Sequence, residues 1–297
     1  MIQPALPSFN ALLAQSGIDP KSVLVMRHRP WESSLNLIFD TIAAEHPDLF
    51  NCYQSTHGPK TEAALKRAKF LASFIRHQAG TALFIGLFAV RGFRPLTAAE
   101  VQARPWHREL VAMGMSGDFA TNKSDLIAEF ELEETDWARD WSQRLVVRWP
   151  GADRAWYQWA DRNVFQIEAI AFGPLLEPPV PNWDRMCPTW AELRVLPRKW
   201  KNSLIHWRGI YLITDTSDNM RYVGSACGGE NLLQRWKEYS ETGHGGNKHL
   251  HRRNPEAFRF SILELVSPTA SKEAVIALES NWKERLLTRW PHGLNDN

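Results

Sequence analysis

The sequence predicts a protein of the mixed α/β (α+β) class with two domains, and three observations support this. The chain has 297 residues, and 44% of them are apolar, which is typical of folded domains of about 100–200 residues each. A proline-rich stretch at 172–182 breaks regular structure. Strand-like runs dominate before this break, whereas strands and helices alternate after it. We therefore expect a first domain at 1–171, a basic linker at 172–204 and a second domain at 205–297.

The first domain is expected to combine a few helices with a β-rich core. Residues 23–26 are typical of a short strand, and the apolar residues of 35–44 and 60–78 recur at helical spacing. Four later runs have the β-branched, aromatic or alternating pattern of strands: 82–91, 125–132, 144–149 and 164–170. Strands joined by irregular loops favour a small β-barrel or a strongly bent sheet. At the level of fold alone, such a domain resembles PUA or EVE barrels, which bind modified bases or RNA.

Composition limits the classes of partner. The net charge is only +2, so a nucleic-acid partner would require a local basic surface. The longest apolar runs are too short to span a bilayer, and the first residues show no secretory signal. Three scattered cysteines match neither a disulfide framework nor a zinc motif. We expect a cytoplasmic protein that does not bind membranes, and its oligomeric state, monomer or dimer, stays open.

Fourteen tryptophans are unusual for a chain of this length, and many lie between 137 and 207. A buried tryptophan fills a core, but its ring also stacks on nucleic-acid bases. Both interpretations stay open for the cluster of Trp149, Trp156, Tyr157 and Trp159. If the cluster contacts nucleic acid, we expect Trp156 and Trp159 to stack on bases.

The second domain has a different pattern. Residues 209–213 and 221–225 are typical of two strands, and the short polar connection between them predicts an antiparallel hairpin. Further elements are expected in the order helix, short helix, strand and long helix, at 231–242, 248–253, 258–266 and 271–289. This pattern predicts a three-stranded antiparallel sheet flanked by helices.

Five short pieces in this domain resemble the GIY-YIG nuclease family. They occur in the family's order and in the expected element types, and they cover about the last third of the chain. From Tyr222 to Asn295 the likeness is strongest to phage intron-encoded homing endonucleases. The pieces are Gly209-Ile210-Tyr211, Tyr222-Val223-Gly224 with Val in place of Ile, Arg235, Glu279 and Leu294-Asn295.

The resemblance implies hydrolysis of DNA phosphodiester bonds at a site with a single metal ion. Glu279 would bind Mg²⁺, with Mn²⁺ as the alternative, and Arg235 would bind the non-bridging phosphate oxygens. Tyr211 would orient the attacking water or relay its proton, although a phenol is a weak base at neutral pH. Tyr222 would help to bind the phosphate, and Asn295 would position its neighbours. Arg235 and Glu279 are expected to converge on the same face.

One departure from the family concerns Tyr239, which stands where some members carry a histidine one helical turn after the arginine. Spacing of four residues places Tyr239 beside Arg235, so we include it among the site residues. The histidines of 244–251 lack cysteines at zinc-ligand spacing and are interpreted as part of a solvated surface that faces DNA. The residues expected to contact phosphates there are Lys237, Lys248, Arg252 and Arg253.

Three functions stay open at this point. The first is a restriction or defence endonuclease whose specificity comes from the first domain. The second is a repair or recombination nuclease that acts on damaged or branched DNA. The third is a catalytically idle nucleic-acid-binding protein, against which the intact set of Tyr211, Arg235 and Glu279 argues.

Overall fold

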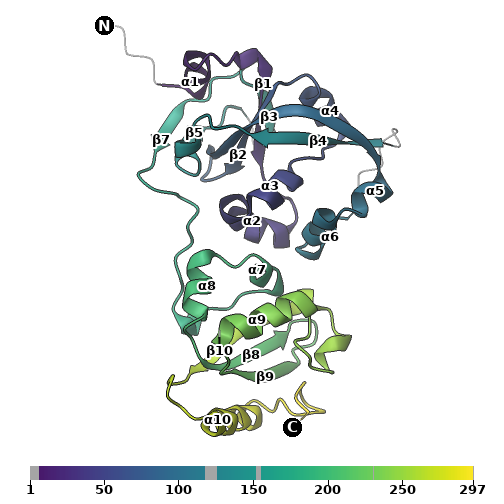
Figure 1. Ribbon diagram of the computed structural model, residues 1–297, viewed down its shortest axis with the longest axis vertical. Coiled ribbons are helices and arrows are strands. Elements are labelled where there is room, and N and C mark those ends of the chain that lie inside the picture. The colour runs from purple at the N-terminus through teal and green to yellow at the C-terminus, as the bar shows by residue number, and fades with distance from the viewer. Residues whose placement is uncertain (1–6, 118–125, 152–154, 230, 297) are drawn as a thin grey trace. The chain divides into compact units, whose positions relative to one another are not determined.

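A computed structural model describes residues 7–117, 126–151, 155–229 and 231–296 (Figure 1). The chain divides into two compact units, Met1–Glu177 and Pro178–Asn297, and each has its own β-sheet. Within the described ranges, no helix combines the length and the apolar character that crossing a bilayer requires.

The N-terminal unit is built on a mixed seven-stranded sheet with the order β6-β1-β2-β3-β5-β7, and β4 pairs with β3. Its strands are β1 (Val23–His28), β2 (Phe70–Arg76), β3 (Thr81–Thr97), β4 (Leu126–Glu134), β5 (Leu145–Arg148), β6 (Tyr157–Trp159) and β7 (Ile167–Ile170). Its helices are α1 (Phe9–Gln15), α2 (Ser33–Glu45), α3 (Pro47–Tyr53), α4 (Pro59–Leu65), α5 (Ala98–Gln102) and α6 (Pro105–Ala112), with 3₁₀ turns at Pro20–Ser22 and Arg139–Trp141. β1 and β2 are parallel and the other pairs are antiparallel.

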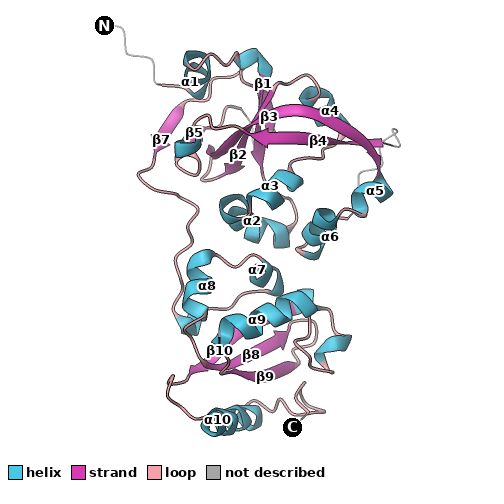
Figure 2. Cartoon of the chain, viewed as in Figure 1, coloured by secondary structure: helices cyan, strands magenta, loops and turns pink. Residues whose placement is uncertain are grey.

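The long strand β3 gives the sheet its curl (Figure 2). Its first part pairs with β2 and β5, and its second part pairs with β4. Register shifts between Ser73 and Phe74 and between Val90 and Gly92 mark irregularities that bend the strand. Of the two alternatives that the sequence left open, a small β-barrel and a strongly bent sheet, the structure has the second, an open half-barrel that ends in β6 and β7.

One predicted helix is wrong. The run 60–78 was expected to be helical throughout, but α4 ends at Leu65 and Phe70–Arg76 forms β2 in the middle of the sheet. The five residues from Leu71 to Ile75 are all buried. A strand that is buried on both faces lacks polar alternation, so its apolar residues also fit a helical period.

The core of this unit settles the role of Trp149. Its side chain is 4% exposed and packs with Phe74 and Phe165. Its indole N–H donates to the carbonyl of Ala155 at 2.8 Å, as a buried tryptophan requires. Trp149 is therefore a core residue and not a surface for stacking bases.

The C-terminal unit has the predicted three-stranded antiparallel sheet, in the order β10-β8-β9. α9 lies on one face of this sheet and α10 lies on the other (Figure 1). Residues 178–204, which the sequence analysis assigned to a linker, belong to this unit and contain two helices. The elements are α7 (Trp190–Arg194), α8 (Arg198–Leu204), β8 (Gly209–Asp215), β9 (Arg221–Ala226), α9 (Asn231–Thr242), β10 (Phe258–Leu265) and α10 (Lys272–Arg285), with 3₁₀ turns at Trp183–Arg185, Leu250–Arg252 and Pro255–Ala257.

A buried ion pair fastens the turn between β8 and β9. The Arg253 guanidinium lies 2.6 Å from a carboxylate oxygen of Asp215 and 2.8 Å from one of Asp218. Burial alone would raise the pKa of Asp215, but hydrogen bonds from Ser217 and Arg253 outweigh it and hold the pKa below its usual value. Arg253 was expected to contact DNA phosphates, and the structure instead engages it with two carboxylates of its own chain.

Replacing the Asp215 carboxylate should destabilise the C-terminal unit in a pH-dependent way. In Asp215→Asn we expect the free energy of unfolding at pH 7 to fall by about 1–3 kcal/mol, because charge-assisted hydrogen bonds to Arg253 are lost. The folded pKa of Asp215 is lowered, so its stabilisation is present above the unfolded value of about 3.9 and is lost as the pH falls through the folded value. Urea unfolding at pH 7 and pH 3 would measure the deficit, which should shrink at pH 3.

The matched control is Asp218→Asn, which removes a second carboxylate from the same guanidinium. The Asp218 side chain is 45% exposed, whereas that of Asp215 is 2% exposed, so its loss should cost less. Equal deficits in the two variants, or a deficit for Asp215→Asn that does not change with pH, would contradict this account.

Candidate active site

Three tyrosines from three elements pack together at one end of the C-terminal sheet. The hydroxyls of Tyr211 on β8 and Tyr239 on α9 are hydrogen-bonded at 3.0 Å, and both side chains are fully buried. Tyr222 on β9 completes the group, because its ring centroid lies 6.5 Å from that of Tyr211 and 6.4 Å from that of Tyr239. The structure thus brings together the three tyrosines that the sequence analysis named.

Two glycines make this arrangement sterically possible. Tyr211 pairs with Gly224 across the sheet, and a Cβ at Gly224 would lie 2.5 Å from the Tyr211 Cζ atom. Gly245 leaves room for the Tyr239 ring in the same way, since a Cβ at Gly245 would lie 2.5 Å from Cε1 of Tyr239. Gly245 also has φ of +53°, which side chains disfavour. The glycine of the second sequence motif therefore serves to admit the phenol of the first.

Arg235 adds a positive charge to this group. It precedes Tyr239 by one turn of α9, and its guanidinium carbon lies 5.6 Å from the centre of that ring. Burial lowers the pKa of Arg235, but the electrostatic influence of Tyr211 and Tyr239, a hydrogen bond with Tyr211 and the Glu238 carboxylate outweigh it and raise the pKa, so the side chain stays cationic. It also forms an ion pair with Glu238, and about a third of its side chain, 31%, is exposed.

Burial decides what the Tyr211 hydroxyl can do. It raises the pKa of Tyr211 above the usual value of a phenol, and the neighbouring Tyr222 adds to the effect, while Arg235 and the hydrogen bond with Tyr239 oppose it. A phenol with a raised pKa keeps its proton at neutral pH and donates a hydrogen bond. Of the two roles that the resemblance implied, the structure favours orientation of a reacting group over removal of its proton.

Glu279 on α10 lies on the opposite face of the sheet. Its carboxylate accepts a short hydrogen bond from the Ser225 hydroxyl and forms an ion pair with Lys283 at 2.7 Å. Ser225 directly follows Gly224, against which the Tyr211 phenol packs. Tyr211 therefore contacts Gly224 of the edge strand β9 from one face of the sheet, and Glu279 contacts the next residue, Ser225, from the other face.

This geometry corrects one expectation. Arg235 and Glu279 were expected on the same face, but α9 and α10 pack on opposite faces of the sheet (Figure 1). Consecutive side chains of a strand point to opposite faces, so a site that uses both Gly224 and Ser225 must extend around the edge of β9. The two groups approach the same strand and not the same surface of the sheet.

Asn295 holds this edge strand in place. Its side-chain oxygen accepts from the Val223 N–H at 2.9 Å, and its side-chain amide donates to the Val223 carbonyl at 2.8 Å. Its own backbone N–H donates to Thr288 at 2.8 Å, and the side chain is nearly fully buried. The amide therefore pairs with β9 as a neighbouring strand would, at the residue between Tyr222 and Gly224.

The remaining predicted contact residues belong to both units. Lys248 forms an ion pair with Asp296 at 2.8 Å, whereas Lys237 and Arg252 are exposed side chains. In the N-terminal unit, Trp159 is half-buried and the Arg67 guanidinium lies 5.6 Å from its ring centre. Trp156 lines a cavity in that unit.

The donor set at Glu279 fits a divalent ion that keeps most of its water. In the part of the chain that the structure describes, no group of three or more acidic, histidine or cysteine side chains is placed to hold a metal. A single carboxylate suits Mg²⁺, which retains several waters and takes further ligands from phosphate. Lys283, which the sequence analysis did not name, neutralises the same carboxylate. Its position four residues after Glu279 on the helix was the available signal.

Placing a methyl group beneath the Tyr211 phenol should destabilise the C-terminal unit. In Gly224→Ala the added Cβ would overlap the Tyr211 ring, so we expect a loss of about 1–3 kcal/mol in unfolding free energy. The control is Gly229→Ala, where no atom lies within 4 Å of the added Cβ. Urea unfolding followed by circular dichroism measures both variants, and equal stability of the two would refute the proposed packing.

Comparisons with known proteins concern the C-terminal unit. Residues 208–292 match the family model described as the GIY-YIG catalytic domain. The catalytic domain of intron endonuclease I-TevI, solved in a mutant form, is 30% identical and is aligned over 31% of this chain and 94% of its own, with a TM-score of 0.26. The catalytic domain of homing endonuclease I-TevI is 32% identical over 30% of this chain and 98% of its own, also with a TM-score of 0.26. No curated protein matches the chain. Through its residues 208–292, which form a catalytic domain that hydrolyses phosphodiester bonds, the chain belongs to the GIY-YIG nuclease family.

Proposed function

We propose that the chain is a metal-dependent DNA endonuclease whose C-terminal unit cleaves and whose N-terminal unit selects the target. The observation that carries this proposal is the meeting of Tyr211 and Glu279 at consecutive residues of β9. A protonated phenol, a fixed guanidinium and a carboxylate that can bind a metal are the groups that phosphodiester hydrolysis requires.

In this proposal each side chain has one task in the displacement at phosphorus. Arg235 donates to the non-bridging oxygens, whose negative charge grows in the transition state. The Tyr211 hydroxyl donates a hydrogen bond that orients the attacking water. Tyr239 holds that hydroxyl in position through the hydrogen bond between the two phenols. A water oxygen forms the new bond to phosphorus as the P–O bond to the leaving sugar oxygen breaks; the attacking water releases a proton to solvent, and the leaving oxygen takes one from solvent. Mg²⁺ at Glu279, with Mn²⁺ as the alternative, would supply a more acidic water and neutralise charge.

For the biological role, we propose restriction or defence in the cytoplasm. A nuclease module joined to a separate unit with its own core and an aromatic-lined cavity fits an enzyme that must choose its DNA. A panel of unmodified, 5-methylcytosine, 5-hydroxymethylcytosine and branched DNA in Mg²⁺ tests this role. A preference for one modification state supports it, and a preference for branched DNA would assign the enzyme to repair or recombination instead.

Removing the Glu279 carboxylate should abolish cleavage and leave binding largely intact. We expect Glu279→Ala to cut DNA at least about 10³-fold more slowly in Mg²⁺, because the metal would lose its protein ligand. Its affinity for uncut DNA should stay within about threefold, since Arg235 and the exposed side chains of Lys237 and Arg252 remain. Gel-based cleavage and fluorescence anisotropy measure the two properties.

The matched control is Glu284→Ala on the same helix, where the side chain is 71% exposed and lies 3.6 Å from Arg289. This variant should cut at the rate of the unchanged protein. Near-normal cleavage by Glu279→Ala in Mg²⁺ would remove Glu279 from the proposed site.

The two units should divide affinity and selection between them. A chain of residues 178–297, which is one compact unit, should still cut DNA but with weaker binding and less preference among substrates. Phosphate contacts provide affinity without sequence information, and base contacts provide discrimination. Circular dichroism would first establish that the shortened chain folds, and cleavage rates on the same DNA panel would follow. If the shortened chain keeps the full preference, the selecting element lies in the catalytic unit.

A further inference from the structure

The N-terminal unit contains a cavity of about 480 Å³ at the carboxyl end of β1. His28, the last residue of β1, and Arg29 line it together with Trp31 of the loop that leads to α2. The cavity lining also includes Tyr53 of α3, His57 before α4 and Trp156 before β6. Open sheets with parallel strands commonly bind ligands at this end, and the volume lies in the range of small-molecule pockets.

We propose that this cavity accepts one unstacked nucleobase of the DNA substrate. The proposal rests on the proposed function, since it assigns the selecting role of the N-terminal unit to a defined place. It concerns a base that has left the double helix or lies in single-stranded DNA, because a paired base cannot enter a cavity.

Aromatic rings form several walls of the cavity. The ring centroids of Trp156 and His57 lie 5.7 Å apart, and those of Tyr53 and His28 lie 5.9 Å apart. Trp31 is 81% exposed, which is unusual for a tryptophan and leaves its ring available at the rim. Flat aromatic walls favour a flat aromatic ligand, because every base has a face that stacks.

Two histidines supply unused hydrogen-bonding atoms on the same cavity. Nε2 of His28 and Nε2 of His57 are buried, and neither has a hydrogen-bond partner among the described residues. The His28 side chain is 3% exposed, and the two rings are nearly parallel, with an interplanar angle of 16°. Buried polar atoms are otherwise almost always paired, so these two are poised for a ligand.

Buried Gln54 orients both rings. Its side chain hydrogen-bonds to His28 and its backbone to His57, so each ring is tied to the protein while its Nε2 has no partner among the described residues. Burial lowers the pKa of His28 to about 3 and that of His57 to about 4, and the repulsion between the two rings adds to the effect at His28. Both imidazoles are therefore neutral at physiological pH.

Neutral imidazoles favour a base over a phosphate. Each offers one donor or one acceptor according to its tautomer, which suits the edge of a base, whereas phosphate sites use cations and arrays of N–H donors. Arg29 on the same rim would reach the backbone of a strand whose base enters the cavity. Glu32, which also lines the cavity, would repel a free phosphate deep inside.

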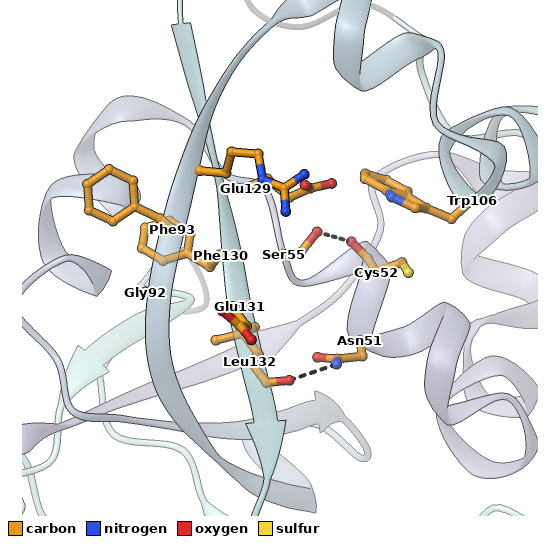
Figure 3. Close-up of a pocket in the computed structure, with 11 residues that line it drawn as sticks. Asn51, Cys52, Ser55, Gly92, Phe93, Trp106, Glu129, Phe130, Glu131 and Leu132 are labelled. Atoms are coloured by element: carbon orange, nitrogen blue, oxygen red, sulfur yellow. Dashed lines mark hydrogen bonds between the residues drawn. The ribbon is translucent and has the colours of Figure 1, made fainter.

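A second cavity of this unit also has aromatic walls, but it has no histidine in its lining and serves as a comparison (Figure 3). It has about 560 Å³ and lies between α3 and the β3–β4 pair. Its polar side chains already have partners, since Asn51 donates to the Leu132 carbonyl at 2.9 Å and Ser55 to the Cys52 carbonyl at 2.7 Å (Figure 3). Glu129 and Glu131 line it together with Arg94, and the Glu129 carboxylate forms an ion pair with Arg104 at 2.8 Å.

Photochemical crosslinking tests where a base lies. The probe is a single-stranded oligonucleotide with one central 5-iodouracil, bound to the full chain carrying Glu279→Ala so that it is not cut. A single strand removes the cost of extruding the base. We expect crosslinks in the peptides that contain Trp31, Tyr53 or Trp156. Crosslinks found only in other peptides would overturn the proposal.

Substitution of the walls measures their contribution. Trp156→Ala and Trp31→Ala should each weaken binding of the oligonucleotide about 5-fold to 150-fold. Trp31→Ala keeps the test sound if Trp156→Ala fails to fold, because the Trp31 ring is largely exposed. His57→Phe should retain stacking but reduce the difference in affinity between bases, since both ring nitrogens are lost, including Nε2, while an aromatic ring remains. Nucleoside monophosphates added at millimolar concentration show whether a free nucleotide competes for the cavity.

Two control variants remove an aromatic ring elsewhere in the same unit. Phe172→Ala changes a fully exposed residue outside the cavity, and Trp106→Ala changes the wall of the second cavity. Both should bind the oligonucleotide as the unchanged protein does. If Trp31→Ala and folded Trp156→Ala also bind normally, the base cavity is refuted while the nuclease proposal stands. If the unchanged chain does not cut DNA in Mg²⁺, the proposed function fails independently of these binding results.

Discussion

The pairing of the Asn295 amide with Val223 is the interaction on which the nuclease site depends. β9 is an edge strand, so its outer hydrogen-bonding groups would otherwise face water and leave the strand free to slide or fray. One side chain fixes the strand at the residue between the two that contribute to the site. The phenol packed on Gly224 and the carboxylate bonded to Ser225 keep their relative position only while β9 stays in register.

The electrostatics of the site follow from burial and local pairing. Tyr211 and Tyr239 are neutral at physiological pH, as phenols ordinarily are, burial raises the pKa of both further, and their hydroxyls share one hydrogen bond. Arg235 and Glu279 carry the charges, and each has a counterion on its own helix, Glu238 for the arginine and Lys283 for the glutamate. The resting site is therefore balanced in charge, and a phosphate and a metal ion replace ion pairs that already exist.

The sequence predicted the catalytic unit well, because its signals are local. A hairpin, an amphipathic helix and a few motif residues fall within short stretches, and the structure contains the corresponding elements. It was wrong where the deciding contacts are distant. The residues of β2 were predicted to be helical, because a strand that is buried on both faces has no polar face to distinguish it from a helix. The partners of Arg253 lie far back in the chain at Asp215 and Asp218, and the cavity in the N-terminal unit is assembled from segments that no periodicity connects.

The order of strands in the N-terminal sheet has a consequence for how this unit is made during translation. β1 pairs with β6, so Leu24 must wait for Trp159 to leave the ribosome, and Ser8 likewise bridges to Gln166. Contacts between residues so far apart in the chain form late and slow the folding of a domain. The Arg27 N–H donates to the Trp156 carbonyl at 2.7 Å, so the aromatic wall of the cavity arrives with the same late segment. A nascent chain therefore acquires this cavity only when nearly the whole unit has been synthesised.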